Sequence, residues 1–161
     1  MSMPPLGTPE LFAQVQAEER ELVFDAFTRD DAWMLGSRLR TAALERGLPI
    51  VIGIVFAGQR LFHTALEGAT PDNDAWLERK TRATLQYHRS SLGVGEQFRA
   101  RGGSFESDAR LDPREIAGNG GVLPITVHGL GVVGAVGVSG LPQLEDHAFV
   151  VEQLRAHLRG L

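Results

Sequence analysis

The chain has 161 residues, of which 43% are hydrophobic and 22% are charged, as expected for one globular domain. Sixteen basic and twenty acidic residues give a net charge of −4, which argues against nucleic acid as a partner because such binding requires a basic face. The chain has no cysteine, which excludes disulfides and thiolate metal sites and fits a reducing compartment. Neither a signal peptide nor an apolar run of roughly 18 residues is visible, so we expect a cytoplasmic protein without a membrane partner.

Caps and apolar patterning predict the elements of the N-terminal part. Thr8 before Pro9 is typical of a helix start, and Asp30 and Gly47 are the expected N-cap and C-cap of a second helix. The predicted elements are a mobile tail at residues 1–7, a helix from Pro9 to about Glu21, a short strand at 22–24 and a helix over 31–46.

The remainder of the chain, up to residue 161, is predicted to continue the same single domain, which begins at residue 8. Residues 50–56 are apolar on both faces, as in a central strand, and the turn at 57–59 leads into a partner strand. The predicted elements are strands at 50–56 and 60–66, a helix from 71 to about 90, a helical segment at 92–101, a glycine-rich loop at 102–121, strands at 122–127 and 132–138, and a helix from 142 to about 159.

The order of these elements indicates the fold class. Two strand pairs alternate with helices, and the short turn inside each pair makes its strands antiparallel neighbours. The simplest architecture is one antiparallel sheet with helices packed on it, an α+β layered sandwich.

A glycine-rich stretch matches a dinucleotide-binding pattern by its letters alone. Gly129-Leu-Gly131-Val-Val-Gly134 reads as G-x-G-x-x-G, but the valines that follow favour a strand and no strand-helix-strand unit surrounds them. The stretch is therefore interpreted as a hairpin.

Ser139 lies in Gly137-Val-Ser139-Gly-Leu141, which fails the nucleophile-elbow pattern G-x-S-x-G at Leu141. The favoured interpretation is a turn serine that bonds local backbone. The alternative is part of an anion site at the start of the last helix.

Lys80 falls in the middle of the apolar face of the third predicted helix. An unpaired buried ammonium is costly, so Lys80 must pair with an acid or with carbonyls of the glycine loop, or else meet a ligand. The pairing interpretation is favoured. The residues that share this face are Trp76, Leu77, Ala83, Thr84, Tyr87 and His88.

His147 lies within the apolar stripe of the last helix. It is predicted to be a buried histidine that hydrogen-bonds a neighbour, with a ligand contact as the alternative. The five histidines show no tight metal-ligand spacing, so no metal site is predicted.

Four segments carry a resemblance to a known family over roughly residues 8 to 160. The chain resembles the haem-degrading domain family, which includes GlcG and HbpS-like proteins, and within it the branch of small single-domain proteins. The segments are Asn73-Asp-Ala-Trp-Leu-Glu-Arg-Lys80, Ser90-Ser91, Gly120-Gly-Val-Leu-Pro-Ile125 and Val138-Ser-Gly-Leu-Pro-Gln-Leu-Glu-Asp-His147.

The resemblance implies a profilin-like α/β sandwich with an antiparallel five-stranded sheet, and assembly into a homo-oligomer. It also makes haem a possible cofactor, for which His88, His147 and Tyr87 are the candidate axial ligands. The leading hypothesis is a cytoplasmic homo-oligomeric binding protein for a small or tetrapyrrole-like ligand. The alternatives are an enzyme on a small acid or carbonyl, with Lys80 as charge stabiliser and His147 as acid/base, and an assembly module without a ligand. The predicted ligand-binding residues are Lys80, Thr84, Tyr87, His88, Gly120, Gly121 and His147.

Overall fold

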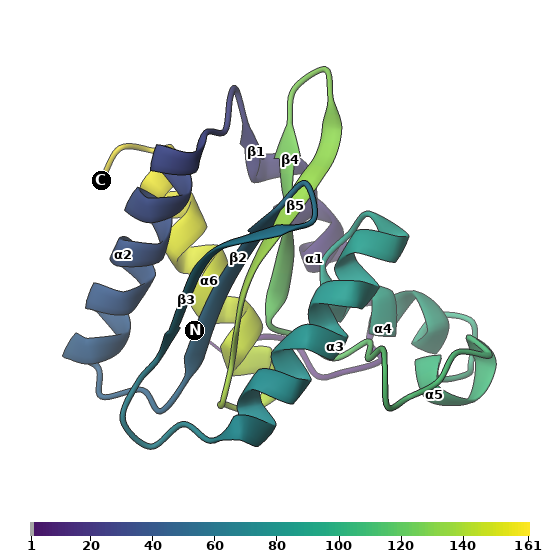
Figure 1. Ribbon diagram of the computed structural model, residues 1–161. Helices are drawn as coiled ribbons and strands as arrows, with labels where there is room; N and C mark the ends of the chain where they lie inside the picture. Colours follow the sequence, from purple (N-terminus) through teal and green to yellow (C-terminus); the bar gives the residue numbers. More distant parts are fainter. Residues whose placement is uncertain (1) are drawn as a thin grey trace.

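The computed structural model describes residues 2–161, so the first residue of the predicted tail lies outside it. Figure 1 shows a layered molecule in which helices cover both faces of one sheet. The elements are α1 (Pro9–Glu21), β1 (Val23–Phe24), α2 (Arg29–Glu45), β2 (Val51–Phe56), β3 (Gln59–Ala65), α3 (Pro71–Tyr87), α4 (Ser91–Arg99), α5 (Phe105–Asp108), β4 (Val122–Val127), β5 (Gly131–Ser139) and α6 (Gln143–Leu158).

The sheet has five strands in the order β1-β4-β5-β2-β3. Four of them form antiparallel neighbours as predicted, but β1 pairs with β4 in parallel, through Val23 opposite Thr126. The expectation of a purely antiparallel sheet is therefore wrong at this edge. A hairpin turn forces its two strands to be antiparallel, whereas β1 and β4 are joined by most of the chain and no turn constrains their direction.

Different helices pack on the two faces of the sheet. Helices α2 and α6 cover one face and enclose the main apolar core, while α3 packs on the other face with α4 beside it (Figure 1). Side chains of β5 alternate between the faces, since Val136 and Val138 join the main core and Ala135 packs with Leu77 of α3. Both cavities described below lie on the α3 face.

Several helices begin or end at other residues than predicted, because different residues cap them. The side chain of Thr28 accepts the amide of Asp31 and begins α2, so Asp30 lies inside the first turn and is not the cap. The third helix ends at Tyr87 because His88 takes a left-handed conformation with φ 55°, and Ser90 caps a separate helix, α4. The predicted loop at 102–121 contains the short helix α5.

The glycine-rich stretch forms the β4–β5 hairpin, as predicted. Gly129 and Gly131 adopt positive φ angles in the turn between the two strands, and Gly131 begins β5. No helix follows the glycines directly, so the local structure differs from that of a dinucleotide-binding loop.

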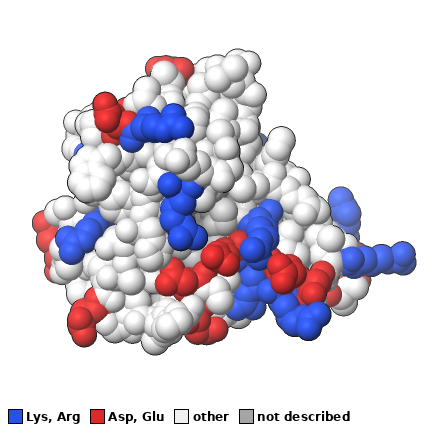
Figure 2. Space-filling model, viewed as in Figure 1, with Lys and Arg blue, Asp and Glu red and all other residues white. Residues whose placement is uncertain are grey.

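The surface shows no large patch of a single charge on the side seen in Figure 2, where acidic and basic side chains interleave around α3 and α5. Within residues 2–161, none of the helices has the length and apolar character to cross a membrane.

Candidate functional site

Three of the predicted site residues, Lys80, Gly120 and Gly121, come together where α3 meets the start of α6. The ammonium of Lys80 donates hydrogen bonds to the carbonyl of Gly120 at 3.1 Å and to the carbonyl of Val138 at 2.8 Å. It also pairs with Oδ2 of Asp146 at 3.2 Å. Three oxygen acceptors satisfy the three donors of an ammonium group, so the pairing interpretation of Lys80 is the one that the structure shows.

Because the cluster is buried, removal of one of its charged groups is expected to destabilise the fold strongly. Lys80 and Asp146 are each 2% exposed. Burial lowers the pKa of Lys80 and raises the pKa of Asp146, and the opposite charge of each partner offsets part of that shift. The amide of Leu141 adds a hydrogen bond to Oδ1 of Asp146 at 3.1 Å. The cluster thus joins α3, the loop before β4, the end of β5 and α6.

Thr84, Tyr87 and His88 lie away from the Lys80 cluster. The hydroxyl of Thr84 is buried and donates to the carbonyl of Val122 at 3.3 Å, and Tyr87 packs against an aromatic cluster. His88 is exposed at the left-handed end of α3. The helical wheel places these residues on one arc, but Thr84 lies about one turn beyond Lys80 along α3, and Tyr87 and His88 lie about two turns beyond it. The aromatic partners of Tyr87 are Phe98 and Phe105.

His147 is fully buried between α6 and α1, where its Nε2 lies 3.1 Å from Oε1 of Glu18. This is the buried, hydrogen-bonded histidine favoured from the sequence. The backbone of Gly120 passes close behind it, because a Cβ at Gly120 would lie 3.3 Å from the Cβ of His147. His147 therefore borders the Lys80 cluster from the side of the main core.

A second hollow, which we call the hairpin pocket, lies between the β2–β3 hairpin and α3 and encloses about 520 Å³. This volume is in the range of small-molecule sites. Its floor is formed by small or apolar residues, and a Cβ at Gly53 would lie only 3.0 Å from Leu77. The residues that line it are Gly53, Ile54, Val55, Gly58, Arg60, His63, Asp74, Leu77, Glu78, Thr81, Arg82 and Ala135.

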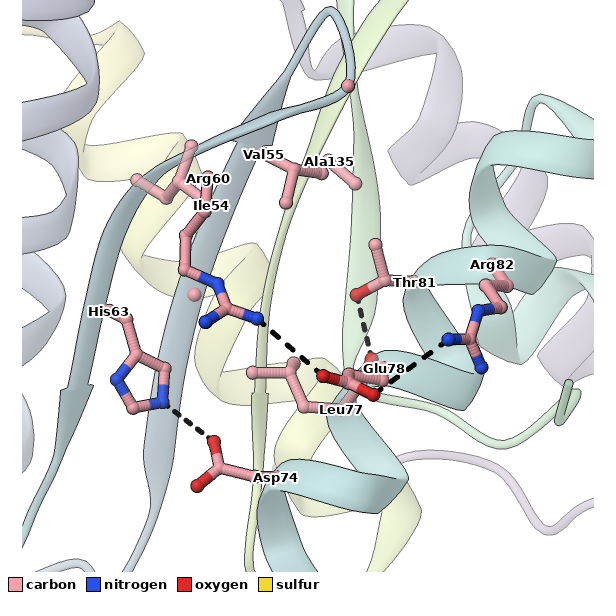
Figure 3. A pocket seen from close by; sticks show the side chains of 12 residues that line it. Ile54, Val55, Arg60, His63, Asp74, Leu77, Glu78, Thr81, Arg82 and Ala135 are labelled. Atoms are coloured by element: carbon pink, nitrogen blue, oxygen red, sulfur yellow. Dashed lines mark hydrogen bonds and ion pairs between the residues drawn. The ribbon is translucent and has the colours of Figure 1, made fainter. Parts of the chain in front are cut away.

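Five ionisable side chains gather at the hairpin pocket. Nε2 of His63 on β3 lies 2.7 Å from Oδ1 of Asp74 on α3. The carboxylate of Glu78 lies between two guanidinium groups, 3.6 Å from Arg60 and 3.9 Å from Arg82, as Figure 3 shows. Both ion pairs of Glu78 are long and half exposed, so they hold Arg60 weakly and leave it free to meet an anionic group. Arg82 is held more firmly, because its Nη1 also donates to the carbonyl of Glu115 at 2.9 Å.

A β-bulge explains why the sequence did not reveal this pocket. Residues three apart on a regular strand point to opposite faces of the sheet, so the sequence predicts that Arg60 and His63 lie on opposite faces. In the structure Ile54 pairs with Phe62 and Val55 pairs with Arg60, which leaves Leu61 as an extra residue. The bulge brings Arg60 and His63 to the α3 face together. The only sequence signal was the spacing of Asp74, Glu78 and Arg82 on one side of α3.

The structure defines a layered α+β domain with two cavities between the sheet and α3. The chain belongs to the family described as haem degrading protein HbpS-like, whose sequence model matches residues 27–155. A UPF0303 protein of Streptomyces coelicolor is 55% identical over 91% of this chain and 93% of its own length. A UPF0303 protein of Edwardsiella ictaluri is 42% identical over 95% and 98%.

Solved structures share the fold. The crystal structure of Ybr137w protein superposes with a TM-score of 0.84 at 30% identity, covering 92% of this chain and 88% of the other. HbpS follows with a TM-score of 0.64 at 21% identity, over 82% and 89%. A PduOC:heme complex has a TM-score of 0.67 at 18% identity, over 81% and 94%.

Proposed function

We propose that this chain is a binding protein for a tetrapyrrole such as haem, and that the hairpin pocket holds the ligand. The observation that carries the proposal is His63, an imidazole anchored at one ring nitrogen by Asp74 in a pocket with one loosely held arginine, Arg60. Histidines that bind metals commonly have the second ring nitrogen fixed by a carboxylate. The family description and the fold shared with a haem complex support the same ligand class.

The residues of the pocket fit the chemistry of haem. Nδ1 of His63 has no hydrogen-bond partner within residues 2–161, which leaves it available to an iron. The guanidinium group of Arg60 would pair with one carboxylate of haem, and Arg82 would offer the other carboxylate the donors that Glu115 does not use. The floor of Gly53, Val55 and Ala135 suits an apolar ring face. When bound, the haem would supply the redox chemistry, and the protein would orient it and restrict its contact with water.

Haem titration tests the proposal. We expect a saturable Soret shift with the wild-type protein, and a loss of affinity of at least tenfold in His63→Ala because the axial ligand is gone. His128→Ala is the matched control, since His128 is an exposed histidine outside the pocket. A wild-type protein without a Soret shift, or a His63→Ala variant with unchanged affinity, would refute the assignment. Loss of the shift in His88→Ala instead would move the site to the end of α3.

The proposal includes a cytoplasmic homo-oligomer. Trp33 and Met34 on α2 are 66% and 60% exposed, and exposed large apolar groups that adjoin one another favour an interface between protein chains. The absence of cysteine is compatible with a reducing compartment. Sedimentation of the wild type is expected to show an oligomer that Trp33→Asp weakens. A wild-type monomer at micromolar concentration would contradict this part.

The enzyme hypothesis gains no support from the geometry at Lys80. An ammonium with three bonded acceptors has no donor left for a reacting group. His147 faces Glu18 inside the core and lines none of the described cavities. The contacts of the two residues join elements, Lys80 linking α3 to α6 and His147 linking α6 to α1.

A further inference from the structure

A smaller hollow lies on the outer side of the Lys80 cluster, between the starts of α3 and α6, and encloses about 300 Å³. We call it the Ser139 pocket. It is separate from the hairpin pocket, and the two share no lining residue. The residues that line it are Asp72, Asn73, Trp76, Lys80, Asn119, Gly120, Ser139, Gly140, Leu141, Gln143 and Asp146.

Ser139 provides an unpartnered hydroxyl inside this pocket. The residue is only 4% exposed, and no hydrogen bond of its hydroxyl is found within residues 2–161. Its direction follows from the alternation along β5, because Val138 points into the main core and Ser139 must point to the α3 face. The hydroxyl is not enclosed by protein atoms, since it opens into the pocket, where it is free to donate to a ligand.

The first turn of α6 faces the same space. Helix α6 has 16 residues and begins after Pro142, and no side chain caps its N-terminus. The first amides of an uncapped helix present donors and a partial positive charge. Gln143 accepts the amide of Gly120 through Oε1 at 3.0 Å, which leaves its side-chain NH₂ as a further donor. Ser139 at the end of β5 and Gln143 at the start of α6 thus both supply hydrogen-bond donors to the Ser139 pocket.

The charges around the pocket indicate which acceptor it takes. Lys80 and Asp146 neutralise one another, so the pocket contains no free cation. Asp72 adds one negative charge at the exposed rim. A phosphate dianion generally recruits arginine or lysine, whereas a singly charged carboxylate can be held by neutral donors and a helix N-terminus.

We propose that the Ser139 pocket binds the carboxylate of a small organic acid, with the Ser139 hydroxyl and the first amides of α6 as donors. The volume admits a small metabolite and is below that of the hairpin pocket. The site also explains the residues around Ser139 better than a turn serine does, since a turn serine would bond local backbone. The inference is independent of haem and of the hairpin pocket.

The test uses the full chain without haem and sodium acetate as the probe, at constant ionic strength. Acetate is expected to cause saturable shifts in the amide resonances of Gly140 and Gln143, and its neutral isostere acetamide is expected to cause none. Ser139→Ala should weaken acetate binding by roughly tenfold, the usual effect of losing a hydrogen bond to a charged group. Asn119→Ala tests a second lining donor. Ser37→Ala, on α2 and outside the pocket, is the control and should bind acetate as the wild type does.

Three results would overturn the inference. They are the absence of saturable shifts with acetate, equal affinities of Ser139→Ala and wild type, and tighter binding of inorganic phosphate than of acetate. Retention of the wild-type Soret titration in Ser139→Ala would show that the two pockets act separately. Failure of haem binding in the wild type would leave the acetate result unaffected, so the two proposals fail independently.

Discussion

Replacement of Lys80 by methionine is expected to lower the free energy of unfolding by about 3–5 kcal/mol, the cost of leaving a buried charge without its partner. Methionine preserves the length of the side chain but removes all three hydrogen bonds of the ammonium. Asp146 would then lie 2% exposed with only backbone donors to stabilise its charge. The carbonyls of Gly120 and Val138 would also lose a donor.

Urea denaturation of Lys80→Met against the wild type measures this effect. The double variant Lys80→Met with Asp146→Leu is the informative comparison, because replacing a whole buried ion pair by apolar groups is often neutral. We expect the double variant to recover most of the lost stability. A loss below about 1 kcal/mol in the single variant would show that the pair is not a structural connection.

Lysine suits this position better than arginine does. Lys80 is the only lysine in the chain, and every other basic side chain is an arginine. A compact ammonium can point its donors at three acceptors from separate elements, whereas a planar guanidinium would require a wider, flatter set of partners. The chain therefore uses lysine where α3, β5 and α6 converge within a small volume.

The sequence predicted most of the local structure because helices and hairpins depend on neighbouring residues. The apolar run of β2, the Thr8-Pro9 start of α1 and the β4–β5 hairpin each carry their own signal. The direction of β1 was mistaken because its partner β4 lies about a hundred residues away, and no local pattern reports such a pairing.

For the candidate sites too, the sequence predicted what depends on neighbouring residues and missed contacts between segments that lie far apart in the chain. The helical wheel correctly placed Lys80 on a buried face, but its partners at Gly120, Val138 and Asp146 come from distant segments. The hairpin pocket was missed because one extra residue in β3 changes which side chains share a face.

Gly121→Ala is the second variant with a large expected effect. Gly121 has φ 137°, a conformation that side chains rarely adopt, and a Cβ there would overlap the ammonium of Lys80 and lie 2.7 Å from the carbonyl of Val138. Overpacking of this kind costs about 1–3 kcal/mol. Backbone strain adds about 1–2 kcal/mol. We therefore expect a loss close to that of Lys80→Met.

Gly129→Ala separates the two contributions to this loss. Gly129 also has a positive φ, 80°, but a Cβ there would have no neighbour within 4 Å. Its variant should show the backbone strain alone, about 1–2 kcal/mol. Equal losses in Gly121→Ala and Gly129→Ala would mean that the contact with the Lys80 cluster has no energetic weight. A larger loss at Gly121, measured by urea denaturation, is the expected result, because Gly121 combines the close contact with Lys80 and a φ that side chains adopt even less readily than that of Gly129.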